Sequence, residues 1–262
     1  MGQTVTPCFF GTSERQLFGV HHPAQGSERS TGVVLCYPAA QEYMLTHWAF
    51  RKLAGMLTRE GFHVFRFDYY GTGDSAGEMQ EGRLATWAQD IRQAATELQD
   101  VTGVQRVALV GLRMGATLAV RAALEGLSTA ALVLWEPVVK GDAYLRELEL
   151  LQARRAARTL FPQPDSPLEM REELLGFAFP RPLRDDVLAV DLAALSAWPT
   201  TRTHLVAAAP KPEYQRLQER LEATGLPFQH HLVPEEGTGG QESALLSNRI
   251  LQTITSLLKE VA

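Results

Sequence analysis

The sequence predicts an α/β protein with a mainly parallel sheet, helices on both faces and an inserted lid. Three observations predict this architecture. Short β-branched and aromatic segments alternate with longer segments of helical period, as in strands joined by crossover helices. A strand, a glycine-flanked turn and an Ala-rich helix follow one another over residues 106–120. The alternation stops between 140 and 198 and then resumes, which is typical of an insertion.

Length and charge limit the classes of function. A chain of 262 residues with 45% hydrophobic residues is expected to form one large domain, or a domain with an inserted lid. The formal net charge of -5 argues against a nucleic-acid surface, because phosphate binding needs a concentrated basic face. We therefore expect the partner to be a small-molecule substrate or ligand, and an anionic one is favoured. A protein partner is the alternative.

The remaining composition indicates a cytoplasmic protein without a cofactor. Only Cys8 and Cys36 occur, and the first residues lack the basic and apolar regions of a signal peptide. No apolar run approaches the roughly 20 residues that span a bilayer. No His or Cys pair has zinc-ligand spacing, so we expect no metal, and no other cofactor is indicated.

The elements can be assigned in chain order. Residues 5–12 and 16–23 are separated by a polar turn and predict an antiparallel hairpin at a sheet edge. Residues 32–37 are apolar enough for a central strand. Further strands are expected at 62–69, 130–138, 203–209 and 228–233, and helices at about 42–59, 84–101, 212–223 and 242–261, with the strand, turn and helix of 106–120 among them.

The insertion is assigned to residues 141–196, and the core to 1–140 and 197–262. Residues 142–160 have a helical pattern, and a Pro-rich stretch and a second mixed segment follow them. Such a segment between two strands of a parallel sheet is the profile of a lid over the strand ends.

The strand, turn and helix of 106–120 provide the context of a G-x-S-x-G nucleophile elbow, but the central residue is Arg113. A guanidinium has five donors, no acceptor and a pKa far above neutrality. It therefore cannot attack a carbonyl or be activated by a neighbouring base.

Local motifs extend this likeness. Tyr-Pro-Ala-Ala-Gln-Glu-Tyr (37–43) stands at the place of an oxyanion loop, and 66–78 at the turn after the fourth strand. With the element order, they make the whole chain resemble the α/β-hydrolase fold. Gly-Leu-Arg-Met-Gly-Ala and Leu-Trp-Glu-Pro-Val-Val-Lys-Gly (134–141) resemble the exosortase A system-associated hydrolases, a branch related to the serine aminopeptidase-like group. In that branch Gly-Leu-Arg also stands where the nucleophile is expected, so the resemblance implies the fold rather than ordinary hydrolysis.

The other triad members are also missing. Ser75 lies in a G-x-S-x-G text match, but it follows a Gly-rich loop rather than a strand-to-helix turn. Glu213 opens a helix, where a carboxylate is a routine dipole partner, whereas Glu136 fits a variant position of the acid. Residues 234–241 contain no histidine to act as the base. His47 follows the oxyanion loop and could line the mouth of the site, although an exposed helical histidine is the simpler interpretation.

Arg113 admits two interpretations. In the first, it binds a substrate carboxylate, phosphate or enolate together with the N-H groups of Met114 and Ala39. In the second, Glu136 or Glu42 neutralises it permanently and the arginine plugs a retired site.

Three hypotheses follow for function. The first, slightly favoured by the lid, is a serine-independent enzyme of bacterial accessory metabolism that acts on an acyl, ester or other anionic intermediate by lyase, isomerase or cyclase-type chemistry. Its catalytic residues would be Arg113, Tyr37 and Glu136, and its substrate-binding residues Ala39, Gln41, Glu42, Met114 and His47. The second is a non-catalytic pseudo-hydrolase that binds a ligand or protein partner. The third, an ordinary esterase or thioesterase using Ser75, is the least favoured.

Overall fold

The computed structural model describes residues 5–157, 172–199, 201–234 and 247–261, and its central feature is an eight-stranded sheet. The strand order is β1-β2-β4-β3-β5-β6-β9-β10. Within this sheet β3, β4, β5, β6, β9 and β10 pair with one another in parallel, whereas β1 and β2 form an antiparallel hairpin at the edge, as predicted, and β2 pairs antiparallel with β4. The strands are β1 (Thr6–Thr12), β2 (Arg15–His22), β3 (Thr31–Cys36), β4 (Val64–Phe67), β5 (Arg106–Leu112), β6 (Ala131–Trp135), β9 (Arg202–Ala207) and β10 (Phe228–Leu232).

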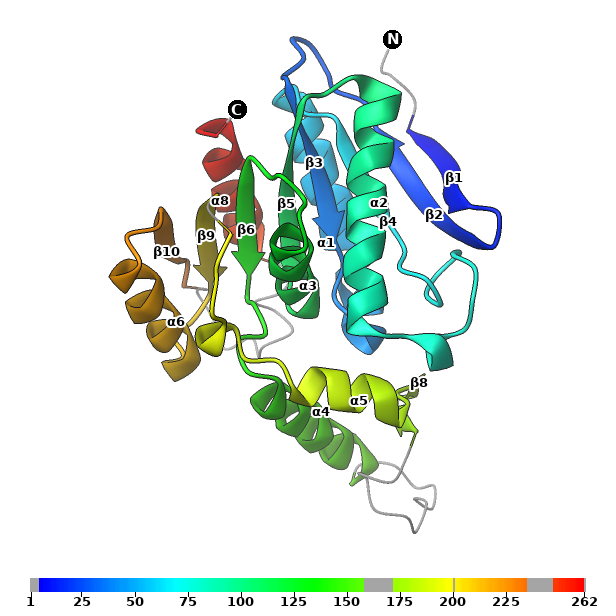
Figure 1. Cartoon of the computed structure of the whole chain (residues 1–262), viewed down its shortest axis with the longest axis vertical. Helices are drawn as coiled ribbons and strands as arrows, with labels where there is room; N and C mark the ends of the chain where they lie inside the picture. The colour runs from blue at the N-terminus through cyan, green and yellow to red at the C-terminus, as the bar shows by residue number, and fades with distance from the viewer. Residues whose placement is uncertain (1–4, 158–171, 200, 235–246, 262) are drawn as a thin grey trace.

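Helices cover both faces of this sheet. In Figure 1, α2 and α3 lie in front of the strands, and α1 and α8 lie behind them. The helix α6 stands beside β10 at the far edge. The core helices are α1 (Ala40–Arg59), α2 (Leu84–Thr102), α3 (Met114–Leu124), α6 (Pro212–Ala223) and α8 (Asn248–Lys259), with a short 3-10 turn η1 (Met79–Glu81) before α2.

The burial pattern explains why these segments fold as they do. Every residue of β3 and β6 is buried, because both faces of a central parallel strand are covered by helices. The helix α8 buries a stripe that includes Ile250, Ile254 and Leu258, which is the helical spacing of an amphipathic segment. Among the described residues, no helix is both long and apolar enough to cross a membrane.

The chain between β6 and β9 forms a small layer beyond the carboxyl ends of the strands (Figure 1). We call residues 141–196, which the sequence predicts to be a lid, the lid segment. Its described elements are α4 (Gly141–Ala156), a two-stranded sheet of β7 (Glu173–Leu174) and β8 (Phe177–Ala178), α5 (Arg181–Leu188) and the 3-10 turn η3 (Leu192–Ala194). Residues 158–171 of the predicted lid lie outside the described residues. The packed lid side chains include Leu145, Leu148, Leu174, Phe179 and Leu183, which join the main core.

Candidate functional site

The turn between β5 and α3 has a strained backbone. Arg113 adopts φ 54° and ψ -118°, a region that residues with a side chain rarely occupy. A Cβ on Gly111 would stand 2.4 Å from the carbonyl oxygen of Gly115, and one on Gly115 would stand 2.2 Å from that of Cys36. The two glycines therefore let α3 start directly against the ends of β3 and β5. The turn presents residue 113 at the carboxyl edge of the sheet.

An ion cluster surrounds the Arg113 side chain, which is 3% exposed. Its Nε donates to Glu42 Oε1 at 2.9 Å, and its Nη2 donates to Glu147 Oε1 at 2.5 Å. Tyr144 donates its hydroxyl to Glu42 Oε2 at 2.8 Å, and its ring centroid lies 5.1 Å from the guanidinium carbon. Carboxylates from α1 and from the lid helix α4 thus both pair with the charge at the elbow. We call Arg113, Glu42, Glu147 and Tyr144 the elbow cluster.

The charges in the elbow cluster reinforce one another. Burial acts to lower the pKa of Arg113, but the nearby Glu42 and Glu147 outweigh it and raise that pKa well above its usual value. Burial and then Glu42 raise the pKa of the Tyr144 hydroxyl, which stays a proton donor. The cluster is therefore a fully formed ion-pair network near neutral pH.

Among the described residues, a small cavity lies beside this network. The neighbouring cavity has a volume of about 10 Å³. It lies between α1, α4 and the segment around β7, and its lining includes Ala39, Gln41, Glu42, Tyr144 and Leu148. Such a volume holds about one water molecule.

Tyr37 lies beside the elbow but is bonded elsewhere. It is fully buried, and its hydroxyl accepts a hydrogen bond from Arg66 on β4 at 2.7 Å. Its ring stacks on Phe50 and on His47. Burial raises the pKa of Tyr37 to about 12. The hydroxyl predicted to transfer a proton is thus engaged on the side of β4, while Arg113 follows β5 on the other side of β3.

Glu136 joins the ends of β6 and β9 to α6. Its Oε1 accepts from the Ala208 N-H at 2.6 Å, and its Oε2 accepts from the Tyr214 hydroxyl at 2.9 Å. Lys211 supplies a cation 3.2 Å from Oε2. In the described residues the carboxylate partners of Arg113 are Glu42 and Glu147, so of the two partners predicted for the arginine only Glu42 pairs with it.

The other predicted site residues occupy varied positions. Ala39 and Gln41 line the small cavity, and Met114 is buried at the first position of α3. His47 is exposed on α1, and burial together with Arg66 lowers its pKa. Ser75 Oγ donates to the Asp68 carbonyl at 2.6 Å and accepts from the Phe18 N-H at 2.8 Å, so it holds a turn against β2.

Two residues of the elbow cluster were not predicted from sequence. Glu147 and Tyr144 stand three positions apart on α4, and residues at that spacing share one face of a helix. The acidic and aromatic pattern on that face was the available signal, but it did not indicate what the face would contact. Within the described ranges, no group of three or more His, Cys, Asp or Glu residues could hold a metal ion.

Solved structures similar to this chain are α/β hydrolases. A putative hydrolase from Agrobacterium vitis S4 superposes with a TM-score of 0.63 at 18% identity, covering 98% of both chains. An esterase from Pyrococcus furiosus gives 0.66 at 18% identity, over 98% of this chain and 89% of the other. Est1E from Butyrivibrio proteoclasticus, solved with ferulic acid, gives 0.67 at 14% identity, over 97% and 96% of the two chains. At such identities the likeness establishes the fold alone.

Sequence comparison adds the family. No curated protein matches the chain significantly. The family described as Serine aminopeptidase, S33, matches residues 31–174, which run from β3 through the elbow into the lid. That match covers more than half of the chain and agrees with the parallel sheet and the strand-turn-helix at 113. The chain therefore belongs to the serine aminopeptidase S33 family and has the α/β-hydrolase fold.

Proposed function

We propose that this chain is a non-catalytic member of its family, in which an ionic plug occupies the nucleophile position and the protein acts by binding a ligand or partner. The elbow cluster carries this proposal. Arg113 is 3% exposed and is held by Glu42 and Glu147 at once. An anionic substrate that approaches the guanidinium therefore meets two carboxylates that already pair with it, and each of them would repel the substrate.

The groups needed for chemistry support the same proposal. A guanidinium cannot serve as a nucleophile. The hydroxyl of Tyr37 and the carboxylate of Glu136 are engaged with partners on other elements, so they do not converge with Arg113 on one reacting atom. General acid-base catalysis requires such convergence within hydrogen-bond reach.

The second candidate is a serine-independent enzyme whose site forms when the lid moves. One observation favours it: the Glu147 side chain is 34% exposed and belongs to the lid helix α4. Withdrawal of α4 would remove the Glu147 carboxylate from Arg113 and free its Nη2 for an anion. This candidate still needs a displacement of Glu42 or an anion that binds to one side of the guanidinium.

The test compares the intact protein with Arg113→Ala. Each is assayed with p-nitrophenyl acetate, p-nitrophenyl butyrate and an acyl thioester, and is exposed to a fluorophosphonate probe. We expect turnover at the buffer rate for both proteins and no labelling. Chemical denaturation should show that Arg113→Ala is less stable by about 3 kcal/mol, because it leaves buried carboxylates without their cation.

Arg154→Ala is the matched control, since Arg154 is exposed on α4 and outside the elbow cluster. It should change neither turnover nor stability beyond about 0.5 kcal/mol. Turnover by the intact protein that disappears in a folded Arg113→Ala variant would establish the second candidate. Labelling by the fluorophosphonate probe would overturn both candidates and indicate ordinary serine esterase chemistry.

A further inference from the structure

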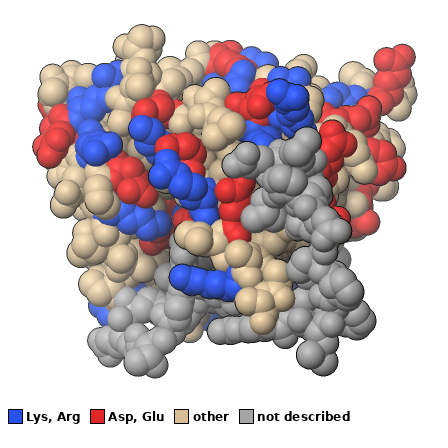
Figure 2. All heavy atoms as spheres, turned by 90° about the horizontal axis from the view of Figure 1, so that it is seen from below, with Lys and Arg blue, Asp and Glu red and all other residues tan. Residues whose placement is uncertain are grey.

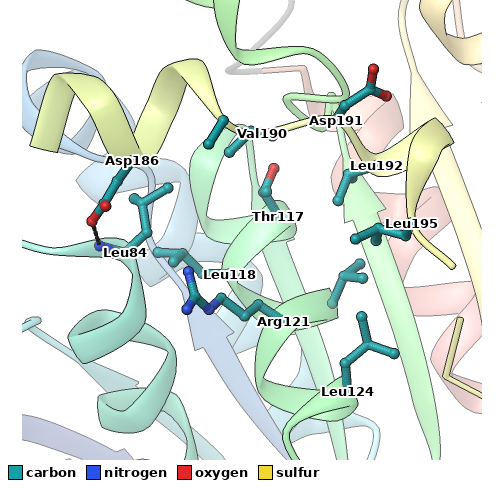
Figure 3. A pocket seen from close by; sticks show the side chains of 12 residues that line it. Leu84, Thr117, Leu118, Arg121, Leu124, Asp186, Val190, Asp191, Leu192 and Leu195 are labelled. Carbon is teal, nitrogen blue, oxygen red and sulfur yellow. Dashed lines mark hydrogen bonds between the residues drawn. The ribbon is translucent and has the colours of Figure 1, made fainter. Parts of the chain in front are cut away.

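A groove runs along the side of α3, away from the elbow cluster. Its walls come from α3, from the start of α2 and from the lid residues 186–195 (Figure 3). The volume is about 250 Å³, and the main apolar lining is Leu84, Leu118, Leu124, Leu192 and Leu195. Because an apolar cavity of about 150 Å³ suffices for benzene, this groove has room for an aromatic ring with substituents or a medium-length alkyl chain.

The polar groups in the wall are already bonded within the protein. Thr117 donates its hydroxyl to the Val138 carbonyl at 2.7 Å. Asp186 accepts two hydrogen bonds from Arg83, at 2.7 and 2.8 Å, and a third from the Leu84 N-H at 3.1 Å. An occupant gains little by directing polar atoms at these groups. The part that lies inside the groove should therefore be apolar.

One wall residue has spare donors. Arg121 uses its Nε to donate to Glu125 Oε1 at 2.8 Å, and within the described ranges its two terminal nitrogens have no hydrogen-bond partner. Glu125 also pairs with Arg92 at 3.6 Å, so one carboxylate serves two guanidinium groups. Figure 3 shows the Arg121 side chain lying along the wall near Leu118. The nearby carboxylate of Asp186 is already paired with Arg83, so among the described residues Arg121 shares only Glu125 with Arg92 and this end of the groove favours an anion.

Backbone hydrogen bonds hold the lid wall of the groove in place. The Val190 N-H donates to the Val187 carbonyl at 3.0 Å, and the Gly141 N-H donates to the Val190 carbonyl at 2.9 Å. The Leu192 N-H donates to the Val139 carbonyl at 2.8 Å. With two helices forming the other walls, the groove exists before anything binds, as in most small-molecule sites.

We propose that this groove binds an amphipathic monoanion, an alkyl or aromatic carboxylate whose apolar body lies among the leucines and whose carboxylate pairs with Arg121. The groove shares no residue with the elbow cluster. The proposal therefore holds or fails independently of whether the elbow is catalytic.

Isothermal titration calorimetry with decanoate and decanol tests the proposal on the full chain. We expect one decanoate per chain, with decanol and the Arg121→Gln variant each about three- to five-fold weaker, since an exposed ion pair contributes up to about 1 kcal/mol. Ala189→Trp should abolish saturable binding. Ala189 lines the groove, is exposed, and has a helical backbone at the end of α5 that accepts a large side chain.

Two variants outside the groove serve as controls: Ala223→Trp on the exposed side of α6 and Arg154→Gln on α4. Both should bind decanoate as the unmodified chain does. Unchanged binding in Ala189→Trp would overturn the site. Equal affinity for decanol and decanoate, or for Arg121→Gln and the unmodified chain, would overturn the assignment of the anion. Absence of decanoate binding together with self-association that Ala189→Trp abolishes would assign the groove to a second copy and overturn the proposal.

Discussion

At the scale of single residues, Arg113 has the backbone geometry of a nucleophile elbow but not a side chain that can act as the nucleophile. The residue keeps a backbone conformation that costs of order 1–3 kcal/mol, although its side chain cannot attack a substrate. The close contacts of Gly111 and Gly115 impose that conformation, because the start of α3 packs directly against the strand ends. The geometry of the turn is thus a packing requirement of the fold.

A substitution of Gly115 by Ala should be strongly destabilising. The added Cβ would lie 2.2 Å from the Cys36 carbonyl oxygen and 2.3 Å from that of Tyr37, and neither backbone atom can move without displacing β3. We expect a loss above about 3 kcal/mol in urea denaturation. The matched control is Gly55→Ala on α1, where the new Cβ meets nothing within 4 Å. That change should raise stability by about 0.5–1 kcal/mol, and a similar loss in both variants would contradict the argument.

The sequence predicted that Arg113 stands at the elbow, but it predicted only one of the two carboxylates that pair with the arginine. Glu42, which lies within the predicted oxyanion loop of 37–43, was one of two candidates. Glu147 could not be found, since its contact with Arg113 spans 34 residues and depends on how α4 packs over the strand ends. A helical pattern shows which residues share a face but not what that face meets.

At the scale of elements, two ion pairs among the described residues attach the helices of the lid segment to the core. Glu147 on α4 binds Arg113, and Asp186 on α5 binds Arg83 before α2. A third pair, Arg184 with Glu149, joins α5 to α4 inside the lid itself. The lid is therefore linked to the core at both of its longer helices, and one of the links is the elbow.

Glu147→Gln should loosen the elbow as well as the lid. The change removes a charge partner of Arg113, so amide hydrogen exchange should quicken in α4, at the start of α1 and around residue 113. The control is Glu149→Gln, whose partner Arg184 lies within the lid. It should quicken exchange in α4 and α5 alone. Equal protection at residue 113 in Glu147→Gln and the unmodified chain would show that the link is not energetically significant.

Element positions agree well with those predicted from sequence, and the differences have physical causes. The strand expected at 62–69 is confined to Val64–Phe67, because the backbone turns at Asp68 to start the Gly-rich loop. The first part of the helix expected at 242–261 lies outside the described residues, and α8 begins at Asn248. The two-residue strands β7 and β8 are too short to produce a period.

At the scale of the whole molecule, the formal net charge is -5. On the face seen in Figure 2, basic and acidic side chains alternate over the surface that is not covered by grey atoms, so this part of the surface has no extended patch of one charge. A small-molecule or protein partner stays a prediction. The fold followed from sequence because strand and helix periodicity is local. The site could be predicted only in part, because its ion pairs join segments that are distant in the sequence and no local pattern indicates such pairs.

Stability should fall as the pH is lowered from about 6.5 to about 4. Burial and then Arg66 lower the pKa of His22 to about 4, and burial and then His231 lower that of His204 to about 4. The unfolded chain, with histidine pKa values near 6.5, binds more protons in this window, so acid favours unfolding. Denaturation at several pH values should show a loss of a few kcal/mol.

His204→Gln provides the comparison for this pH dependence. It removes one of the two most depressed titrations, so the slope of stability against pH should decrease in the same window. His204 is fully buried, and the variant will also be less stable at pH 7, which is why the slope rather than the absolute value is compared. A slope of stability against pH equal to that of the unmodified chain would show that His204 does not cause the pH dependence.

The elbow cluster also sets the cost of placing a serine at position 113. Such a change would leave Glu42 and Glu147 confined beside Tyr144 without the cation that now holds them together. An ordinary triad would further require a histidine between β10 and α8, where residues 234–241 have none. On the proposed function, each single substitution toward a serine hydrolase is therefore destabilising before hydrolysis becomes possible, and the arginine makes that route of descent unfavourable.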